Sequence, residues 1–135
     1  MDVCSGTKII MEVKLTEHFY LTEFACKDGK QVPLSLHHFV KLLATNLQVL
    51  RDEIKEPIHI NSGYRSPDYN KKIGGVTSSQ HLLAKAADIT TKSYTPKQIA
   101  KIIEKLIKAG KMVEGGLGIY PGFVHYDVRG TKARW

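Results

Sequence analysis

The amino-acid sequence predicts an α+β fold, a single domain in which a small antiparallel sheet packs on helices. Two segments have apolar residues at helical spacing, and four short segments have the composition of strands. Their order is helix, strand, loop, strand, helix and hairpin, which is typical of this fold class. A chain of 135 residues has the length of one domain and can bury a core without disulfides. We expect this domain to span residues 1–135, with residues 1–13 as a flexible N-terminal extension.

The clearest helix is predicted over residues 33–55, where apolar side chains recur at helical spacing. Pro33 or Ser35 can open this helix, and Pro57 follows its end. We interpret its apolar stripe as core, because an amphipathic helix in so small a domain covers the interior. The stripe consists of Leu36, Phe39, Val40, Leu43, Leu47, Leu50 and Ile54.

A strand, a long loop and a second strand are expected to follow this helix. Residues 57–62 have the alternation of a short strand, and residues 87–90 have the composition of a buried one. Between them, residues 62–80 are rich in glycine and other turn formers, which predicts an irregular segment. A loop of this length inside a compact domain is often functional.

The last third of the chain predicts a helix and a hairpin. Residues 94–110 form the helix, with Thr95 at its N-cap and Gly110 at its C-terminal cap. Residues 116–120 and 123–128 then read as two strands joined by a tight Pro-Gly turn.

Charge and cysteine content narrow the classes of partner and compartment. The net charge of +7 favours an anionic partner, either nucleic acid or an anionic cell-wall polymer. The basic residues are scattered along the chain, so a solvated surface accounts for most of this charge. Cys4 and Cys26 have neither metal-ligand spacing nor a disulfide framework, and we expect free thiols. No apolar run approaches the roughly 20 residues of a membrane span, and no secretory signal is visible, so synthesis in the cytoplasm is expected.

The final predicted strand carries three polar side chains on one face. Side chains two residues apart share a face of a strand, so His125, Asp127 and Arg129 point the same way as Phe123. The opposite face consists of Val124, Tyr126 and Val128 and suits the core. The polar face is therefore a candidate functional site.

The stretch SSQHLLAKAADIT contains a second candidate histidine, His81, and a second candidate carboxylate, Asp88. Two histidines and one aspartate are a plausible three-ligand set for a catalytic zinc site with an open fourth position. The residues alone leave open the alternative that each is a hydrogen-bonded structural residue. The remaining histidines have weaker contexts and are interpreted as structural: His18, His37, His38 and His59.

Four motifs resemble the zinc D-alanyl-D-alanine carboxypeptidase family, which is part of the lysostaphin, D-Ala-D-Ala peptidase and hedgehog fold group. They are LTEHFYLTEFACKDG, SGYRSPDYNKKIGG, SSQHLLAKAADI and GLGIYPGFVHYDVRG, which follow one another between residues 14 and 130. The opening motif resembles a small branch of bacterial and bacteriophage enzymes that cut peptidoglycan. The resemblance implies a hedgehog/D-Ala-D-Ala-peptidase-like α+β fold.

Carried over motif by motif, the resemblance assigns His81, Asp88 and His125 as zinc ligands. Ser79 matches a serine that hydrogen-bonds a ligand or the substrate. Arg65 matches an arginine that holds the scissile carbonyl or the substrate carboxylate, where a fixed cation stabilises the developing oxyanion.

One departure from the family concerns the general base. Well-known members carry an acidic residue a few positions before the last histidine ligand, and no acidic residue precedes His125 in this way. Asp127 can accept the proton of the attacking water, or it can instead support a ligand; we favour the first role narrowly. Glu114 is a weaker candidate for the base, and Tyr120 is expected to face the site as a donor.

The resemblance implies a hydrolase: a zinc metallopeptidase that cuts peptidoglycan stem peptides as a D-Ala-D-Ala carboxypeptidase or as an endolysin-type endopeptidase. The alternative is a non-catalytic, zinc-stabilised cell-wall binding module. A nucleic-acid binder ranks last because only the net charge supports it. We expect a monomer that binds neither nucleic acid nor membrane, and that acts on the cell wall after bacteriophage-type release.

Overall fold

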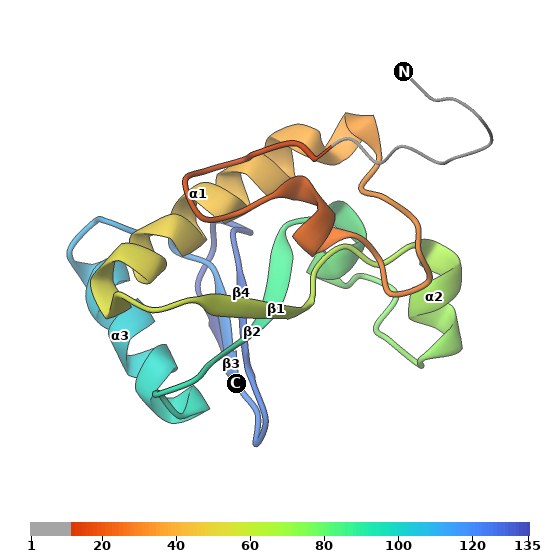
Figure 1. Cartoon of the computed structure of the whole chain (residues 1–135). Coiled ribbons are helices and arrows are strands. Elements are labelled where there is room, and N and C mark those ends of the chain that lie inside the picture. The colour runs from red at the N-terminus through yellow and green to blue at the C-terminus, as the bar shows by residue number, and fades with distance from the viewer. Residues whose placement is uncertain (1–11) are drawn as a thin grey trace.

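The computed structural model describes residues 12–135 and has the predicted α+β architecture. A five-stranded sheet in the order β1-β2-β4-β3-β5 forms its centre (Figure 1). The strands are β1 (Ile58–Ser62), β2 (Ala86–Thr91), β3 (Gly116–Ile119), β4 (Val124–Asp127) and β5 (Ala133–Arg134). The first four pair antiparallel in this order, whereas β5 lies parallel to β3 at the edge.

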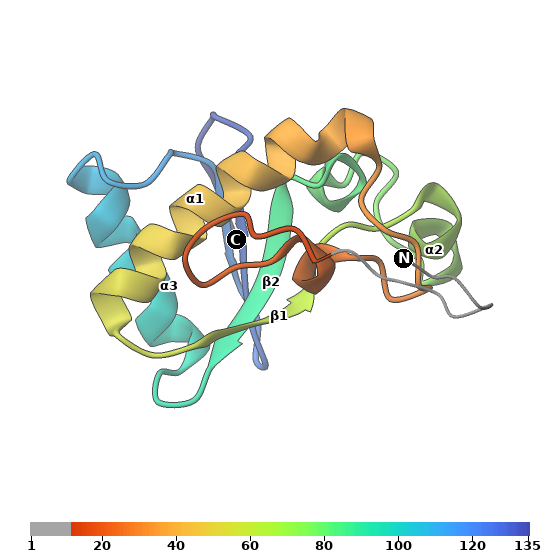
Figure 2. The same cartoon turned by 45° about the horizontal axis from the view of Figure 1, so that its top comes forward.

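Three α-helices surround the sheet within the described residues: α1 (His37–Ile54), α2 (Pro67–Lys72) and α3 (Pro96–Lys108). In both views α3 lies at one end of the sheet and α2 at the other, while α1 passes over the sheet between them (Figures 1 and 2). Short 3-10 helices occupy Leu21–Phe24, Leu34–Leu36 and Gln80–Leu83. No helix among residues 12–135 is both long enough and apolar enough to cross a bilayer.

The core forms between the two long helices and one face of the sheet. Leu43, Leu47 and Leu50 of α1 are fully buried, as expected of the predicted core stripe. Phe39 was wrongly assigned to that stripe, because it is only partly buried and lies under Lys85, outside the core cluster. Ile99 and Ile103 of α3 belong to the same cluster. From the sheet, the cluster takes Ala87 and Ile89 of β2 together with Val124, Tyr126 and Val128. The alternate residues of β2 and β4 therefore point to the other face, away from these helices.

Antiparallel pairing in the middle of the sheet positions the polar residues of this second face. Asp88 of β2 is the direct partner of His125 of β4, and Ala86 is the partner of Asp127. Residues directly opposite one another on antiparallel strands have closely spaced side chains. The register of β2 and β4 thus brings Asp88 and His125 together, although 37 residues separate them in the sequence.

The helix caps agree with the sequence, with one shift at the first helix. Thr95 accepts a hydrogen bond from the backbone of Gln98, as expected of an N-cap. Gly110 has φ +75°, a left-handed conformation that favours glycine after a helix. The first helix begins at His37 and not at Pro33 or Ser35, because residues Leu34–Leu36 form a 3-10 turn.

Besides the short 3-10 helices, α2 and β5 were not predicted. The expected loop over residues 62–80 contains α2, whose N-cap Ser66 accepts from the backbone of Tyr69. The edge strand β5 has only two residues, too few for a visible sequence pattern.

Cys26 is a buried free thiol that accepts a hydrogen bond from the backbone of Ser66. Cys4 and nearly all of the extension expected over residues 1–13 lie outside the described residues.

Candidate metal centre

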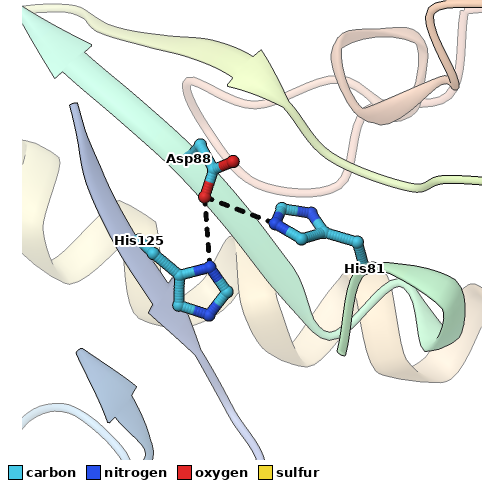
Figure 3. Close-up of side chains that lie close together, drawn as sticks. All are labelled: His81, Asp88 and His125. Carbon is cyan, nitrogen blue, oxygen red and sulfur yellow. Dashed lines mark hydrogen bonds and ion pairs between the residues drawn. The ribbon is translucent and has the colours of Figure 1, made fainter. Parts of the chain in front are cut away.

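His81, Asp88 and His125 meet on the face of the sheet that points away from α1 and α3 (Figure 3). Asp88 Oδ1 lies 3.3 Å from Nε2 of His81 and 3.1 Å from Nδ1 of His125. One ligand atom from each residue lies within 4.8 Å of the other two, and all three side chains are buried. The three residues proposed as zinc ligands therefore form one compact group of nitrogen and oxygen donors.

The loop before β2 fixes the position of His81. Ser79 begins the 3-10 helix Gln80–Leu83, and its hydroxyl accepts from the backbone N–H of His81 at 3.2 Å. The imidazole Nδ1 donates to the carbonyl oxygen of Gly63 at 2.7 Å. This second bond orients the ring and leaves Nε2 directed at Asp88, as outer partners of ligating histidines do.

His125 is held from behind by Asp127, two residues further along β4. The Nε2–H of His125 donates to Oδ2 of Asp127 at 2.7 Å. Asp127 is fully buried, and its carboxylate also accepts from the backbone N–H groups of Gly116 and Arg129. The guanidinium of Arg129 donates to both oxygens of Asp127, at 2.9 and 2.8 Å. Asp127 is thus an anchored anion with its acceptor positions filled by protein donors.

Buried charge shifts the acid–base equilibria of this group. Burial alone raises the pKa of Asp88, but hydrogen bonds from His125 and His81 outweigh it and lower the pKa to about 2. Burial likewise opposes ionisation of Asp127, yet hydrogen bonds from His125 and Arg129 hold its pKa well below the ordinary value. Burial lowers the pKa of His125, and its bonds to Asp127 and Asp88 more than compensate, so the pKa is raised.

The donor set fits a divalent transition metal. His81 Nδ1 and His125 Nε2 can keep their hydrogens for Gly63 and Asp127. The nitrogens that lie beside Asp88, His81 Nε2 and His125 Nδ1, can then offer lone pairs to a metal in place of their contacts with the carboxylate. Two imidazoles and one carboxylate with an open side are a catalytic zinc ligand set.

An open cavity of about 490 Å³ lies against these residues. All three predicted substrate-binding residues, Arg65, Ser79 and Tyr120, line it. Nη2 of Arg65 lies 3.6 Å from Oδ2 of Asp88, so the guanidinium stands beside the metal centre. Within the described chain, Nε of Arg65 and Oε1 of Gln80 are buried polar atoms without a partner. Both side chains border the cavity.

Tyr120, the expected donor, and Glu114, the weaker candidate for the general base, differ in their position relative to the cavity. Tyr120 stacks on Phe123 with ring centroids 4.4 Å apart, and its hydroxyl accepts from Nε1 of Trp135. Glu114 pairs with Arg134 at 2.7 Å and does not border the cavity, so the structure does not bring it to the metal centre.

The four remaining histidines lie outside the cavity. His37 bonds to the carbonyl oxygen of Val32, and His18 to Gln48, which agrees with structural roles. His18 also forms a group with Glu17 and Asp52 that has metal-ligand spacing, but all three are exposed. Exposed groups of this kind are common on solvated surfaces and carry no buried donors.

Sequence reasoning did not assign Trp135 to the site. The centroids of the Trp135 and His125 rings are 5.0 Å apart, and Trp135 borders the cavity. The backbone of Trp135 pairs with Leu117 and Ile119 of β3, which continues the short pairing of β5 and brings the indole back to β4. No periodicity marks this contact, because it depends on a two-residue edge strand.

A small α+β domain with two buried histidines and an aspartate at the wall of an open cavity is typical of metal-dependent hydrolases. A family model described as Peptidase M15 matches residues 17–127, and the chain belongs to this family of metallopeptidases. It is the family of the zinc D-alanyl-D-alanine carboxypeptidases that the sequence motifs resemble. The matched range includes all three residues of the metal centre and ends at Asp127. No match was found among curated proteins.

The role of Asp127 is testable by the substitution Asp127→Asn. Because the carboxylate orients His125 and is saturated with donors, we expect zinc affinity to fall about 10- to 100-fold, with activity recovering when zinc is added. Competition with a chromophoric chelator measures the affinity, and the exposed Asp68→Asn is the control. Unchanged zinc affinity with a loss of about 10²-fold in kcat would instead assign the base role. Full activity without added zinc would exclude both roles.

Proposed function

We propose that the protein is a zinc-dependent peptidase that hydrolyses peptide bonds in peptidoglycan stem peptides. The observation that carries this proposal is the convergence of His81, Asp88 and His125 at the wall of an open cavity, with Arg65 beside them. When bound, zinc polarises the scissile carbonyl and activates the attacking water.

Each ligand has a defined part in holding the metal. His81 would bind through Nε2, because Gly63 occupies its other nitrogen. His125 would bind through Nδ1, with Asp127 accepting from Nε2. Asp88 contributes the negative charge and stays ionised, since its pKa is about 2.

Arg65 is proposed to bind the scissile carbonyl oxygen. Its guanidinium lies next to Asp88 and lines the cavity. Negative charge develops on the carbonyl oxygen as water attacks, and a fixed donor in a site shielded from solvent stabilises that charge. Ser79, through the N-cap bond to His81, positions the ligand, and its side chain also borders the cavity.

Asp127 is proposed as a positioning residue for His125 and not as the proton acceptor. A base must reach the proton that it removes, and Asp127 is fully buried with donors on both oxygens. The sequence favoured Asp127 narrowly as the general base, because strand alternation places it on the same face as His125. The contacts of Asp127 with His125 and Arg129 favour the role of supporting His125 instead.

One observation favours a second candidate, the non-catalytic zinc-stabilised module that binds cell wall. Among residues 12–135, Asp88 is the only carboxylate that borders the cavity, and it is assigned to the metal. The Arg65 guanidinium at the cavity wall next to Asp88 supports the enzyme instead, because a pure scaffold needs no oxyanion donor. We place either activity at the cell wall, where a net charge of +7 complements anionic polymers, after bacteriophage-type release of a monomer.

The experiment is digestion of purified sacculi and defined muropeptides with the zinc-loaded protein, followed by mass spectrometry of the products. A carboxypeptidase removes one terminal residue, whereas an endopeptidase divides the stem or cross-link into two fragments. A chelator should stop product formation, and re-added zinc should restore it. Sacculus binding without any product would favour the binding module and contradict the proposed peptidase.

A further inference from the structure

Trp135 borders two neighbouring hollows of the surface. One is the cavity of the metal centre, and the other is a groove of about 360 Å³ between α3 and the β3–β5 edge of the sheet. Leu117 and Ile119 of β3 and Ala100 of α3 give the groove an apolar lining. Because the metal centre faces away from α3, a chain that leaves it would reach this groove by passing over the indole of Trp135 at the β3–β5 edge.

The indole is held in place although it is substantially exposed. Nε1 of Trp135 donates to the Tyr120 hydroxyl at 2.7 Å, and its backbone pairs with β3 on both sides. The ring lies over Gly118, where an added Cβ would stand 2.5 Å from the indole. A rigid, solvent-facing aromatic ring of this kind offers a large contact area at low entropic cost. Its 47% exposure leaves apolar area for a ligand to cover.

The groove is also positively charged. Lys97 and Lys101 of α3 border it, both are exposed, and neither has an ion-pair partner in the described part of the chain. The one acidic residue of the lining, Glu104, is neutralised by Arg134 through bonds of 2.8 and 2.9 Å. The lysines therefore leave a net positive rim above an apolar floor.

We propose that this groove is an extended substrate subsite that holds a carboxylate-bearing portion of the peptide on one side of the scissile bond. The inference rests on the proposed peptidase function, because it takes the metal centre as the place of cleavage. The peptide would cross the indole of Trp135, its aliphatic parts would contact Leu117 and Ile119, and its carboxylates would pair with Lys97 and Lys101. The groove would thus select acidic peptides over neutral ones with the same scissile bond.

The test uses Trp135 as its own reporter, because it is the sole tryptophan of the chain. Zinc-loaded protein is titrated with an acidic stem peptide and with an analogue whose side carboxylates are amidated, and the indole fluorescence is followed. Both peptides contain the same scissile bond, so initial rates of hydrolysis give kcat and KM in parallel. We expect the acidic peptide to change the fluorescence and to bind about 10-fold more tightly than the amidated one.

The charge-reversal variant Lys97→Glu/Lys101→Glu should remove this preference by raising the KM of the acidic peptide about 10-fold at nearly constant kcat. The matched control Lys108→Glu/Lys111→Glu makes the same change in net charge at exposed lysines that border neither hollow, and should change KM less than about twofold. Lys97→Gln/Lys101→Gln provides a milder second variant, and circular dichroism checks that both remain folded.

The outcomes separate this inference from the proposed function. Equal KM and equal fluorescence titrations for both peptides, or an unchanged preference in the Lys97→Glu/Lys101→Glu variant, would overturn the subsite while hydrolysis stands. Lysine-dependent binding of the acidic peptide without any hydrolysis would support the subsite and contradict the peptidase. Absence of any fluorescence change with a peptide that is hydrolysed would place the substrate away from Trp135 and also overturn the inference.

Discussion

Replacing both His81 and His125 with alanine is expected to eliminate zinc binding and to lower kcat/KM about 10³-fold or more. The estimate follows because Lewis-acid stabilisation supplies several kcal/mol, and each 1.36 kcal/mol is a factor of ten in rate. Removal of the two imidazoles leaves Asp88 as the sole ligand of the three that converge in the structure. Metal content by elemental analysis and hydrolysis of a stem peptide measure the two effects separately.

The matched control for this variant is His38→Ala/His59→Ala. Both residues are exposed histidines that do not border the cavity, so zinc content and activity should match the parent protein. Undiminished zinc in the His81→Ala/His125→Ala protein would refute the assigned ligand set. Zinc loss with unchanged hydrolysis would show that hydrolysis does not depend on the metal and would contradict the proposed zinc-dependent peptidase.

The second large effect is expected for Arg65→Ala, with kcat about 10²- to 10³-fold lower and zinc still bound. Loss of one oxyanion donor typically has this magnitude. Arg65 lies 3.6 Å from Asp88 but is not a ligand, so its removal leaves the three metal-binding side chains in place. Zinc titration and steady-state kinetics on the same sample distinguish metal loss from a loss of catalysis.

Arg51→Ala on α1 is a suitable control, because Arg51 does not border the cavity. Near-normal turnover of Arg65→Ala would assign Arg65 to the structure of its loop, where it also donates to Asn70. A proportional loss of zinc and activity would instead make Arg65 a support for Asp88.

Periodicity predicted the parts of the fold that bury a regular apolar face. The stripe of α1 and the capped helix α3 follow from burial on one side only. The alternation of β4 separates an apolar face from a polar one, and both faces are buried. The short helix α2 was missed because its six residues form less than two turns, and turn-forming residues surround it. The edge strand β5 was missed because two residues cannot display a period.

For the site, the sequence predicted which side chains share a face but not what each atom contacts. Alternation places His125 and Asp127 on one side of β4, yet only the register with β2 brings Asp88 opposite His125. Nδ1 of His125 is the nitrogen proposed to bind the metal because Nε2 is bonded to Asp127, and this contact is visible only in the three-dimensional structure. The resemblance to a known family supplied Arg65 and Ser79, and both line the cavity.

The alternation of β4 has a consequence for how this chain tolerates insertions and deletions. Deleting one residue within Val124–Asp127 would exchange the two faces of the strand, turning the imidazole toward α1 and α3 and an aliphatic side chain toward Asp88. Adding a residue at Gly122, in the turn before the strand and with open space around it, leaves the pairing with β2 intact. Length variation in descendants of this sequence should therefore accumulate in the hairpin turn and be purged from the four residues that follow Phe123.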